Sequence, residues 1–168
     1  MPDSSDLGVE IKRETKIQLY PFTEYFQGFE NVPPIKSLFG NKANEILDKL
    51  KVEFYSSKFG YMGVSDEDGH IMISSHHLRT GDFVTLYLDI VHELHHVKQF
   101  MDGKKLFLME YEYVDSPIEV EAYLPTVQEA RRIGLNDEQI IEYLKIDWIS
   151  TEQHERLVNR MGLRNAKN

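Results

Sequence analysis

The stretch His92-Glu93-Leu94-His95-His96 places two histidines four positions apart, with a glutamate directly after the first. An α-helix advances about 100° per residue, so His92 and His96 would lie about 40° apart on one helical face. Two imidazoles one turn apart can reach the same metal ion, and Glu93, about 100° from His92, can hold a metal-bound water without becoming a ligand. This HExxH pattern therefore predicts a helix that carries a metal site.

The residues around the motif predict the same helix independently. With His92 set at 0°, the apolar residues that fall within roughly 140° to 220° are Tyr87, Ile90, Leu94, Val97 and Met101. One side of the helix is therefore expected to face a core, and the other to carry the polar motif. Asp89 and Gln99 fall on the polar side, where each is either a hydrogen-bond partner for a ligand imidazole or an ordinary solvated residue.

A third metal ligand has to come from elsewhere in the chain, because a catalytic zinc ion usually takes three protein ligands and one water. Downstream, Ser116 suits the cap of a helix and Pro117 its first turn. Glu119 and Glu121 would lie about 200° apart on that helix, so only one of them can face the metal. The residues by themselves leave this choice open.

The motif HELHH followed by Glu119-x-x-Ala122 resembles the gluzincins, zinc peptidases whose third ligand is a glutamate on a second helix. The resemblance covers roughly residues 61–130 and is greatest to small forms, the minigluzincins and the ImmA/IrrE family. It implies that His92, His96 and Glu119 hold one Zn²⁺ ion per chain, with Glu121 as the reserve ligand.

The same resemblance implies peptide-bond hydrolysis, with Glu93 as the general base that takes a proton from a zinc-activated water. Tyr123 stands where those families often carry an aspartate that supports the first histidine. Tyr123 and His154 are candidates to stabilise the transition state, against the alternatives of a packing tyrosine and a structural or exposed histidine. The alternative function is a metal-binding, non-proteolytic module for regulation or protein interaction.

Two short strands are expected just before the motif helix. Residues 60–64 and 70–74 flank an Asp- and Gly-rich turn, Ser65-Asp66-Glu67-Asp68-Gly69, which is typical of a hairpin. In gluzincins the strand before the active-site helix pairs with extended substrate through its exposed backbone. By that resemblance, the strand from His70 to Ser75 is the expected binding edge for a peptide or protein substrate.

The chain has 168 residues, of which 41% are hydrophobic, enough for one domain with a core. We expect an α+β, zincin-like domain over residues 1–168, in which a small twisted sheet with an edge strand lies above the HExxH helix. A glutamate-bearing second helix and extra C-terminal helices, at about 135–168, complete it. Residues up to about 40 are expected to form an N-terminal extension. This extension could inhibit the enzyme, as could a partner protein.

A net charge of -9 argues against general nucleic-acid binding, which needs clustered Lys and Arg. The sequence contains no run of 18 or more apolar residues, which a membrane span would need, so no membrane partner is expected. The acidic, polar start of the chain lacks a signal-peptide pattern, and a cytoplasmic location is therefore expected. With no cysteine, the chain forms no disulfide and offers no thiolate ligand.

Overall fold

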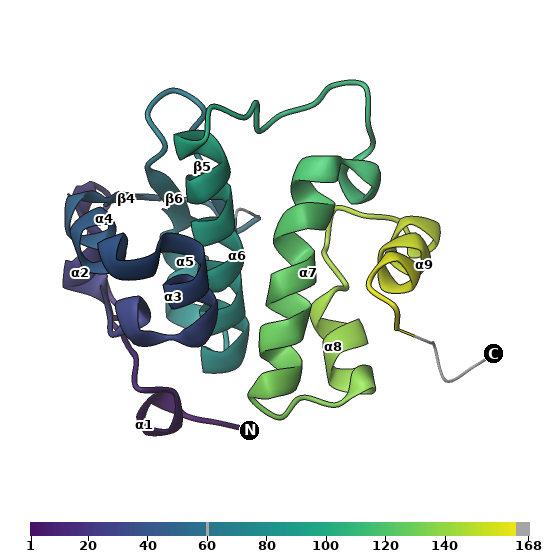
Figure 1. Ribbon diagram of the computed structural model, residues 1–168, viewed down its shortest axis with the longest axis horizontal. Coiled ribbons are helices and arrows are strands. Elements are labelled where there is room, and N and C mark those ends of the chain that lie inside the picture. The colour runs from purple at the N-terminus through teal and green to yellow at the C-terminus, as the bar shows by residue number, and fades with distance from the viewer. Residues whose placement is uncertain (60, 164–168) are drawn as a thin grey trace. The chain divides into compact units, whose positions relative to one another are not determined.

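A four-stranded sheet and the long helix α6 (Phe83–Met101) form the centre of the larger of two compact units in the chain (Figure 1). The structure, a computed structural model, describes residues 1–59 and 61–163. One unit comprises residues 2–106, and the other comprises residue 1 with the chain from residue 107 onward. The combination of helices with small sheets confirms the expected α+β class.

The main sheet has the strand order β2-β4-β6-β5. Its strands are β2 (Leu19–Pro21), β4 (Lys51–Tyr55), β6 (Ile71–Ser74) and β5 (Met62–Val64). β4 pairs antiparallel with β2 and parallel with β6, while β5 pairs antiparallel with β6. A separate two-stranded pair joins β1 (Glu10–Ile11) to β3 (Phe26–Gln27).

The expected hairpin before α6 is confirmed, because β5 and β6 pair with Met62 opposite Ile73 and Val64 opposite Ile71. Gly60, at the start of the first expected strand, lies outside the described residues. The expectation that His70 to Ser75 form the edge of the sheet is wrong. β6 has β5 on one side and β4 on the other, so both of its edges are used. Among the described strands, β5 is the outermost on this side.

Residues from the expected N-terminal extension contribute to the core of their unit. This part contains α1 (Ser4–Leu7), α2 (Phe22–Tyr25), η1 (Phe29–Asn31) and α3 (Pro33–Phe39), followed by η2 (Gly40–Lys42) and α4 (Ala43–Lys49). Phe22, Phe26 and Phe29 are fully buried and contact one another. Phe29 also stacks on Tyr87 of α6, with ring centroids 5.7 Å apart. Aromatic packing of this kind attaches the first forty residues firmly to α6.

Helix α6 has the two faces that its sequence predicts. Asp82 caps it by accepting a hydrogen bond from the Thr85 backbone N–H at 3.0 Å. The stripe of Tyr87, Ile90, Leu94 and Val97 is buried, whereas Met101, at the last turn, is half-exposed. α6 contacts α3 and β5, and α5 (Ser75–Thr80) connects β6 to it. Packing of the apolar stripe thus holds the polar face of α6 in a set orientation within its unit.

The second unit is helical, as expected for the C-terminal part. It contains η3 (Tyr113–Asp115), α7 (Pro117–Arg132), α8 (Asp137–Tyr143) and α9 (Thr151–Arg160). α8 and α9 each begin with a capping box, formed by Asn136 with Gln139 and by Ser150 with Gln153. Ile140, Leu144 and Leu157 are fully buried among these helices. Residues 164–168 of the expected C-terminal part lie outside the described residues.

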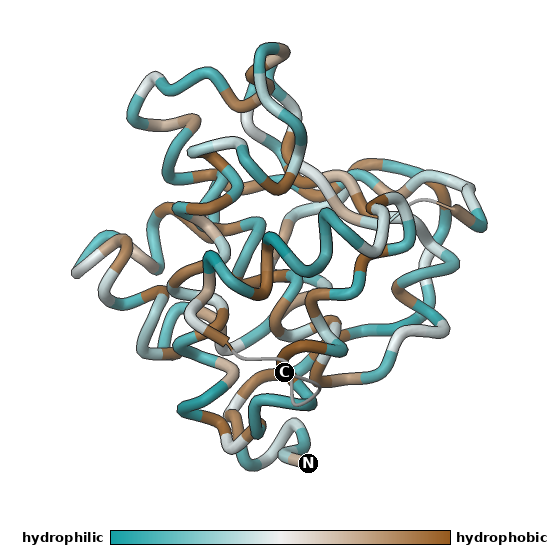
Figure 2. The backbone as a smooth tube through the Cα atoms, turned by 90° about the vertical axis from the view of Figure 1, so that its right-hand side faces the viewer, coloured by the Kyte–Doolittle hydropathy of each residue, from teal (hydrophilic) through white to brown (hydrophobic). Residues whose placement is uncertain are grey.

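Short apolar and polar segments alternate along the chain (Figure 2), as is typical of helices with one buried face. Throughout residues 1–59 and 61–163, no helix combines the length and the apolar character that a bilayer crossing requires.

His70, at the start of β6, joins the turn of the hairpin to the neighbouring strand β4. Its Nε2 lies 2.7 Å from Oε2 of Glu53, and its Nδ1 contacts Oδ1 of Asp68. Burial by itself would lower the pKa of His70, but the hydrogen bonds to Asp68 and Glu53 outweigh it and raise that pKa above the ordinary value of 6.5. The histidine is therefore more readily protonated in the folded chain than in the unfolded one.

Replacing His70 should make stability depend less on pH. A folded-state pKa above 6.5 means that the ion pairs contribute fully below pH 6.5 and lose their contribution as pH rises through the folded-state pKa. Because both carboxylates are exposed to water, we expect His70→Gln to lower the free energy of unfolding by only about 0.2–1 kcal/mol at pH 6. The difference from wild type should shrink at pH 8.5. Urea unfolding at both pH values measures it, with His76→Gln as the control histidine, and an equal difference at both would contradict the assignment.

Candidate metal centre

His92 and His96 point their Nε2 atoms at each other from one face of α6. The two Nε2 atoms are 3.0 Å apart and both side chains are buried. A tetrahedral zinc ion with Zn–N bonds of about 2.0–2.1 Å holds two nitrogen ligands about 3.3 Å apart. The pair of imidazoles is therefore close to the separation that one shared ion requires, as the spacing of the motif predicts.

Gln99 determines which nitrogen of His96 can bind a metal. Its Oε1 lies 2.7 Å from Nδ1 of His96, one turn further along α6. An amide oxygen only accepts, so Nδ1 must carry the proton and Nε2 keeps its lone pair. Metal-binding histidines commonly show this arrangement, in which the second nitrogen donates to a nearby oxygen. Of the two polar-face candidates, Gln99 is thus hydrogen-bonded to His96, one of the two histidines of the motif.

The other candidate, Asp89, contacts a histidine from the preceding helix. Its Oδ2 lies 2.8 Å from Nε2 of His77 on α5, and the His77 ring also meets the Tyr61 ring edge-on at 5.5 Å. Asp89 precedes His92 by three residues, so this contact is made about one turn before the pair of His92 and His96 on the same helix. The contact connects α5 to the polar face of α6.

Glu93 is also buried on α6, beside His92. Its negative charge affects Tyr55, at the end of β4. Burial raises the pKa of the Tyr55 hydroxyl, a hydrogen bond with the Tyr61 backbone lowers it, and the charge of Glu93 raises it. The sequence did not predict this effect of Glu93, because nothing in the pattern of a five-residue strand distinguishes its last tyrosine.

Glu119 and Glu121 lie in the first two turns of α7, in the second unit. Glu119 is half-buried and Glu121 is exposed. Ser116 and Pro117 occupy the predicted cap and first helical position, but the Ser116 hydroxyl makes no cap hydrogen bond. The two glutamates thus differ in burial as their opposite placement on a helix predicts, and Glu119 is the one less exposed to water.

The two transition-state candidates from the sequence lie in the same unit. Tyr123 follows Glu119 by one helical turn, and its hydroxyl is 2.8 Å from that of Tyr113. His154 uses Nε2 to contact the backbone oxygen of Ile141 at 2.8 Å, which joins α9 to α8. The contact of His154 thus joins two helices. The hydroxyl of Tyr123, one turn after Glu119, contacts that of Tyr113.

Gln99→Leu should weaken zinc binding without removing a ligand. Loss of the oxygen that orients His96 is expected to lower zinc affinity about 10- to 100-fold. Gln99→Glu keeps an acceptor at the same place and should retain zinc affinity. Competition with a chromophoric zinc chelator measures both variants, and equal affinity of Gln99→Leu and wild type would contradict the role given to Gln99.

Similarity to a characterised protein would give evidence about the ligands and the reaction that does not depend on these distances. No protein-family model, curated protein or solved structure matches the chain. Its function therefore has to be inferred from the chemistry of its own side chains, above all those of His92, Glu93 and His96.

Proposed function

We propose that this protein is a zinc-dependent metallopeptidase on a zincin-like fold. The observation that carries the proposal is the pair of buried imidazoles on α6, with Nε2 atoms 3.0 Å apart and Nδ1 of His96 held by Gln99. Two imidazole nitrogens this close together on one helical face are ligand atoms of the kind that zinc takes, at nearly the separation that one shared ion requires.

The proposed ligands of the zinc ion are His92, His96 and Glu119, and the lower exposure of Glu119 favours it over the reserve ligand Glu121. Each of the three offers one atom of the kind that zinc takes, an imidazole nitrogen or a carboxylate oxygen. Two neutral imidazoles and one carboxylate leave the fourth position open to water, which is the ligand number of a catalytic site. Zinc fits this donor set, and one ion per chain is expected.

Glu93 is the general base of the proposed reaction. A zinc ion held by the three ligands would lower the pKa of a bound water toward about 7 and polarise the scissile carbonyl. The Glu93 carboxylate accepts a proton from the attacking water and delivers it to the leaving amine. Its burial beside His92 excludes bulk water from that transfer.

The substrate class is an extended peptide or protein segment, and β5 replaces β6 as its binding strand. β6 uses both edges within the sheet, whereas β5 is the outermost described strand beside it. Strand addition requires backbone N–H and C=O groups on a side that no other strand covers. Gly63, in the middle of β5, has no atom within 4 Å of the position that a Cβ would take, so the face of the strand is open there.

Autoinhibition by the N-terminal segment would have to involve only its first residues. Phe22, Phe26 and Phe29 belong to the core around Tyr87, and removing residues up to 40 would expose that core. Arg13 also donates hydrogen bonds to the backbone oxygens of Leu78 and Gly81, at the end of α5. Truncation before Asn41 is therefore expected to unfold this unit rather than to activate an enzyme.

Glu93→Gln and His96→Ala together test the proposal. Glu93→Gln should keep about one zinc per chain but lower peptide hydrolysis at least about 100-fold, because the amide cannot accept the proton. His96→Ala should lose both zinc and activity, whereas His76→Ala on α5 should keep both. Elemental analysis gives the zinc content, and cleavage of a mixed peptide library, read by mass spectrometry, gives the activity.

The outcomes distinguish a metallopeptidase from a metal-binding, non-proteolytic module. Zinc in the wild type and in Glu93→Gln, with no cleavage by either, would favour the metal-binding, non-proteolytic module. A wild type without zinc after reconstitution, or His96→Ala with full zinc content, would contradict the metal centre itself. Full hydrolysis by Glu93→Gln would contradict the general-base role.

A further inference from the structure

Helix α7 lacks the side-chain cap that α8 and α9 possess. The Ser116 hydroxyl is buried and has no hydrogen-bond partner among the described residues. In α8 and α9, by contrast, a capping box fixes the first turn. The start of α7 is instead continuous with η3, because the Ser116 N–H donates to the backbone oxygen of Glu112 at 3.0 Å. The position of the first turn of α7 therefore depends on what holds η3.

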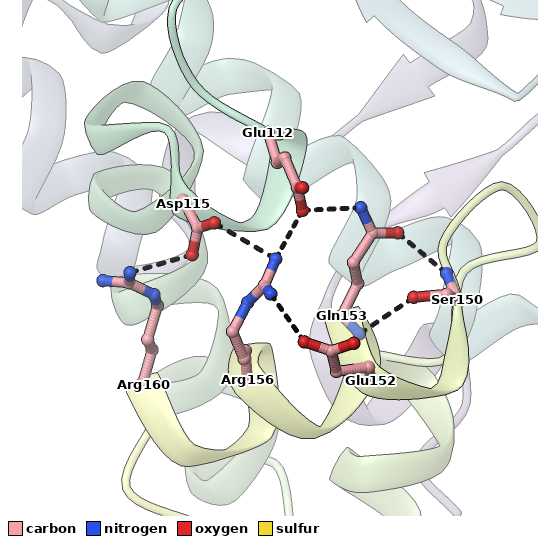
Figure 3. Close-up of polar contacts among 7 residues, drawn as sticks. All are labelled: Glu112, Asp115, Ser150, Glu152, Gln153, Arg156 and Arg160. Carbon is pink, nitrogen blue, oxygen red and sulfur yellow. Dashed lines mark hydrogen bonds and ion pairs between the residues drawn. The ribbon is translucent and has the colours of Figure 1, made fainter.

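Two carboxylates flank η3 on one side. Glu112 precedes the 3₁₀ turn and Asp115 ends it, and a 3₁₀ helix has three residues per turn, so side chains three positions apart lie one above the other. Both carboxylates face α9, which contacts η3 (Figure 3). This arrangement offers two adjacent negative charges to the side chains of α9.

The side chains that α9 presents to these carboxylates lie on one stripe of the helix. Nη2 of Arg156 contacts Oε2 of Glu112 and lies 3.2 Å from Oδ2 of Asp115. Arg160 donates to the other oxygen of Asp115 at 2.8 Å, and Gln153 donates to Glu112 at 2.9 Å. These positions are three and four residues apart, which places them on one helical face.

Arg156 itself is held from its own helix. Its Nη1 lies 3.2 Å from Oε1 of Glu152, one turn earlier, so the guanidinium meets three carboxylates at once (Figure 3). Gln153 is fixed as well, because its Oε1 accepts the Ser150 N–H at 2.8 Å in the capping box. A single exposed ion pair contributes little, but a planar guanidinium shared in a network defines a geometry.

We propose that Arg156 is a positioning residue for the metal ligand Glu119. By binding Glu112 and Asp115, it holds η3 against α9 and so fixes the first turn of α7, where Glu119 stands four residues after Asp115. The inference rests on the proposed function, because it gives Glu119 the role of third zinc ligand. It assigns to α9 a part in metal binding, although none of its residues is a ligand.

The test compares zinc affinity in matched arginine variants at a temperature where all of them are folded. Arg156→Gln should bind zinc at least tenfold more weakly than wild type, and Arg156→Lys should lie between the two because it keeps the charge without the planar fork. Arg131→Gln is the control. It removes an exposed ion pair of the same unit, to Asp137 at 3.7 Å, and should change zinc affinity less than twofold.

A double-mutant cycle distinguishes positioning from a general loss of structure. In a Glu119→Gln background, where only the two histidines bind zinc strongly, Arg156→Gln should cause no further loss of zinc affinity. An equal loss in both backgrounds would overturn the proposal, as would wild-type affinity in Arg156→Gln. If Arg156→Gln does not fold, Glu112→Gln takes its place, because it removes the same ion pair from the η3 side. Its effect on zinc affinity in the two backgrounds is interpreted in the same way.

Failure of the proposed function would look different. If the wild type bound no zinc, or if Glu119→Gln bound zinc as tightly as wild type, the assignment of the ligands would fall, and the role of Arg156 with it. If both ligand tests succeed and only the arginine variants behave as wild type, the positioning role alone is overturned.

Discussion

The cost of burying polar side chains on α6 is the constraint on which the rest of this structure depends. His92, Glu93, His96 and Gln99 are all buried on a helix whose opposite side is packed with Leu, Ile and Val. Removing such groups from water is unfavourable by several kcal/mol unless hydrogen bonds or a metal compensate. The Gln99 contact to His96 supplies part of that compensation, and a shared metal ion would add to it.

The sheet and the N-terminal helices hold α6 in its orientation within the unit. Its apolar stripe is covered by aromatic packing from Phe29 onto Tyr87 and by contacts with α3 and β5. The hairpin of β5 and β6 leads through α5 directly into α6, so the outer strand and the polar face belong to one continuous stretch of chain. The proposed function would use this connection to present an extended substrate to a metal.

The second unit uses exposed charge rather than a large apolar core to fix a local structure. The network around Arg156 joins α9 to η3 at the point where α7 begins without a side-chain cap. Ion pairs of this exposure add little to the free energy of unfolding, yet several of them sharing one guanidinium restrict geometry. Stability and positioning are thus supplied by different residues of α9, with Leu157 and Val158 buried and Arg156 at the surface.

The sequence by itself determined the local features: the helix of the HExxH motif with its two faces, the hairpin before it, and the helical character of the C-terminal part. These features depend on residues less than about ten positions apart, so periodicity and turn chemistry reveal them. Only the tertiary structure decided that β6 is an inner strand, because its parallel partner β4 lies some twenty residues upstream and parallel pairing has no local signal. The same holds for the core position of Phe22 to Phe29 and for the contacts of Arg156 with Glu112 and Asp115. Each of these is settled by which surfaces pack together, and packing joins residues that are distant in sequence.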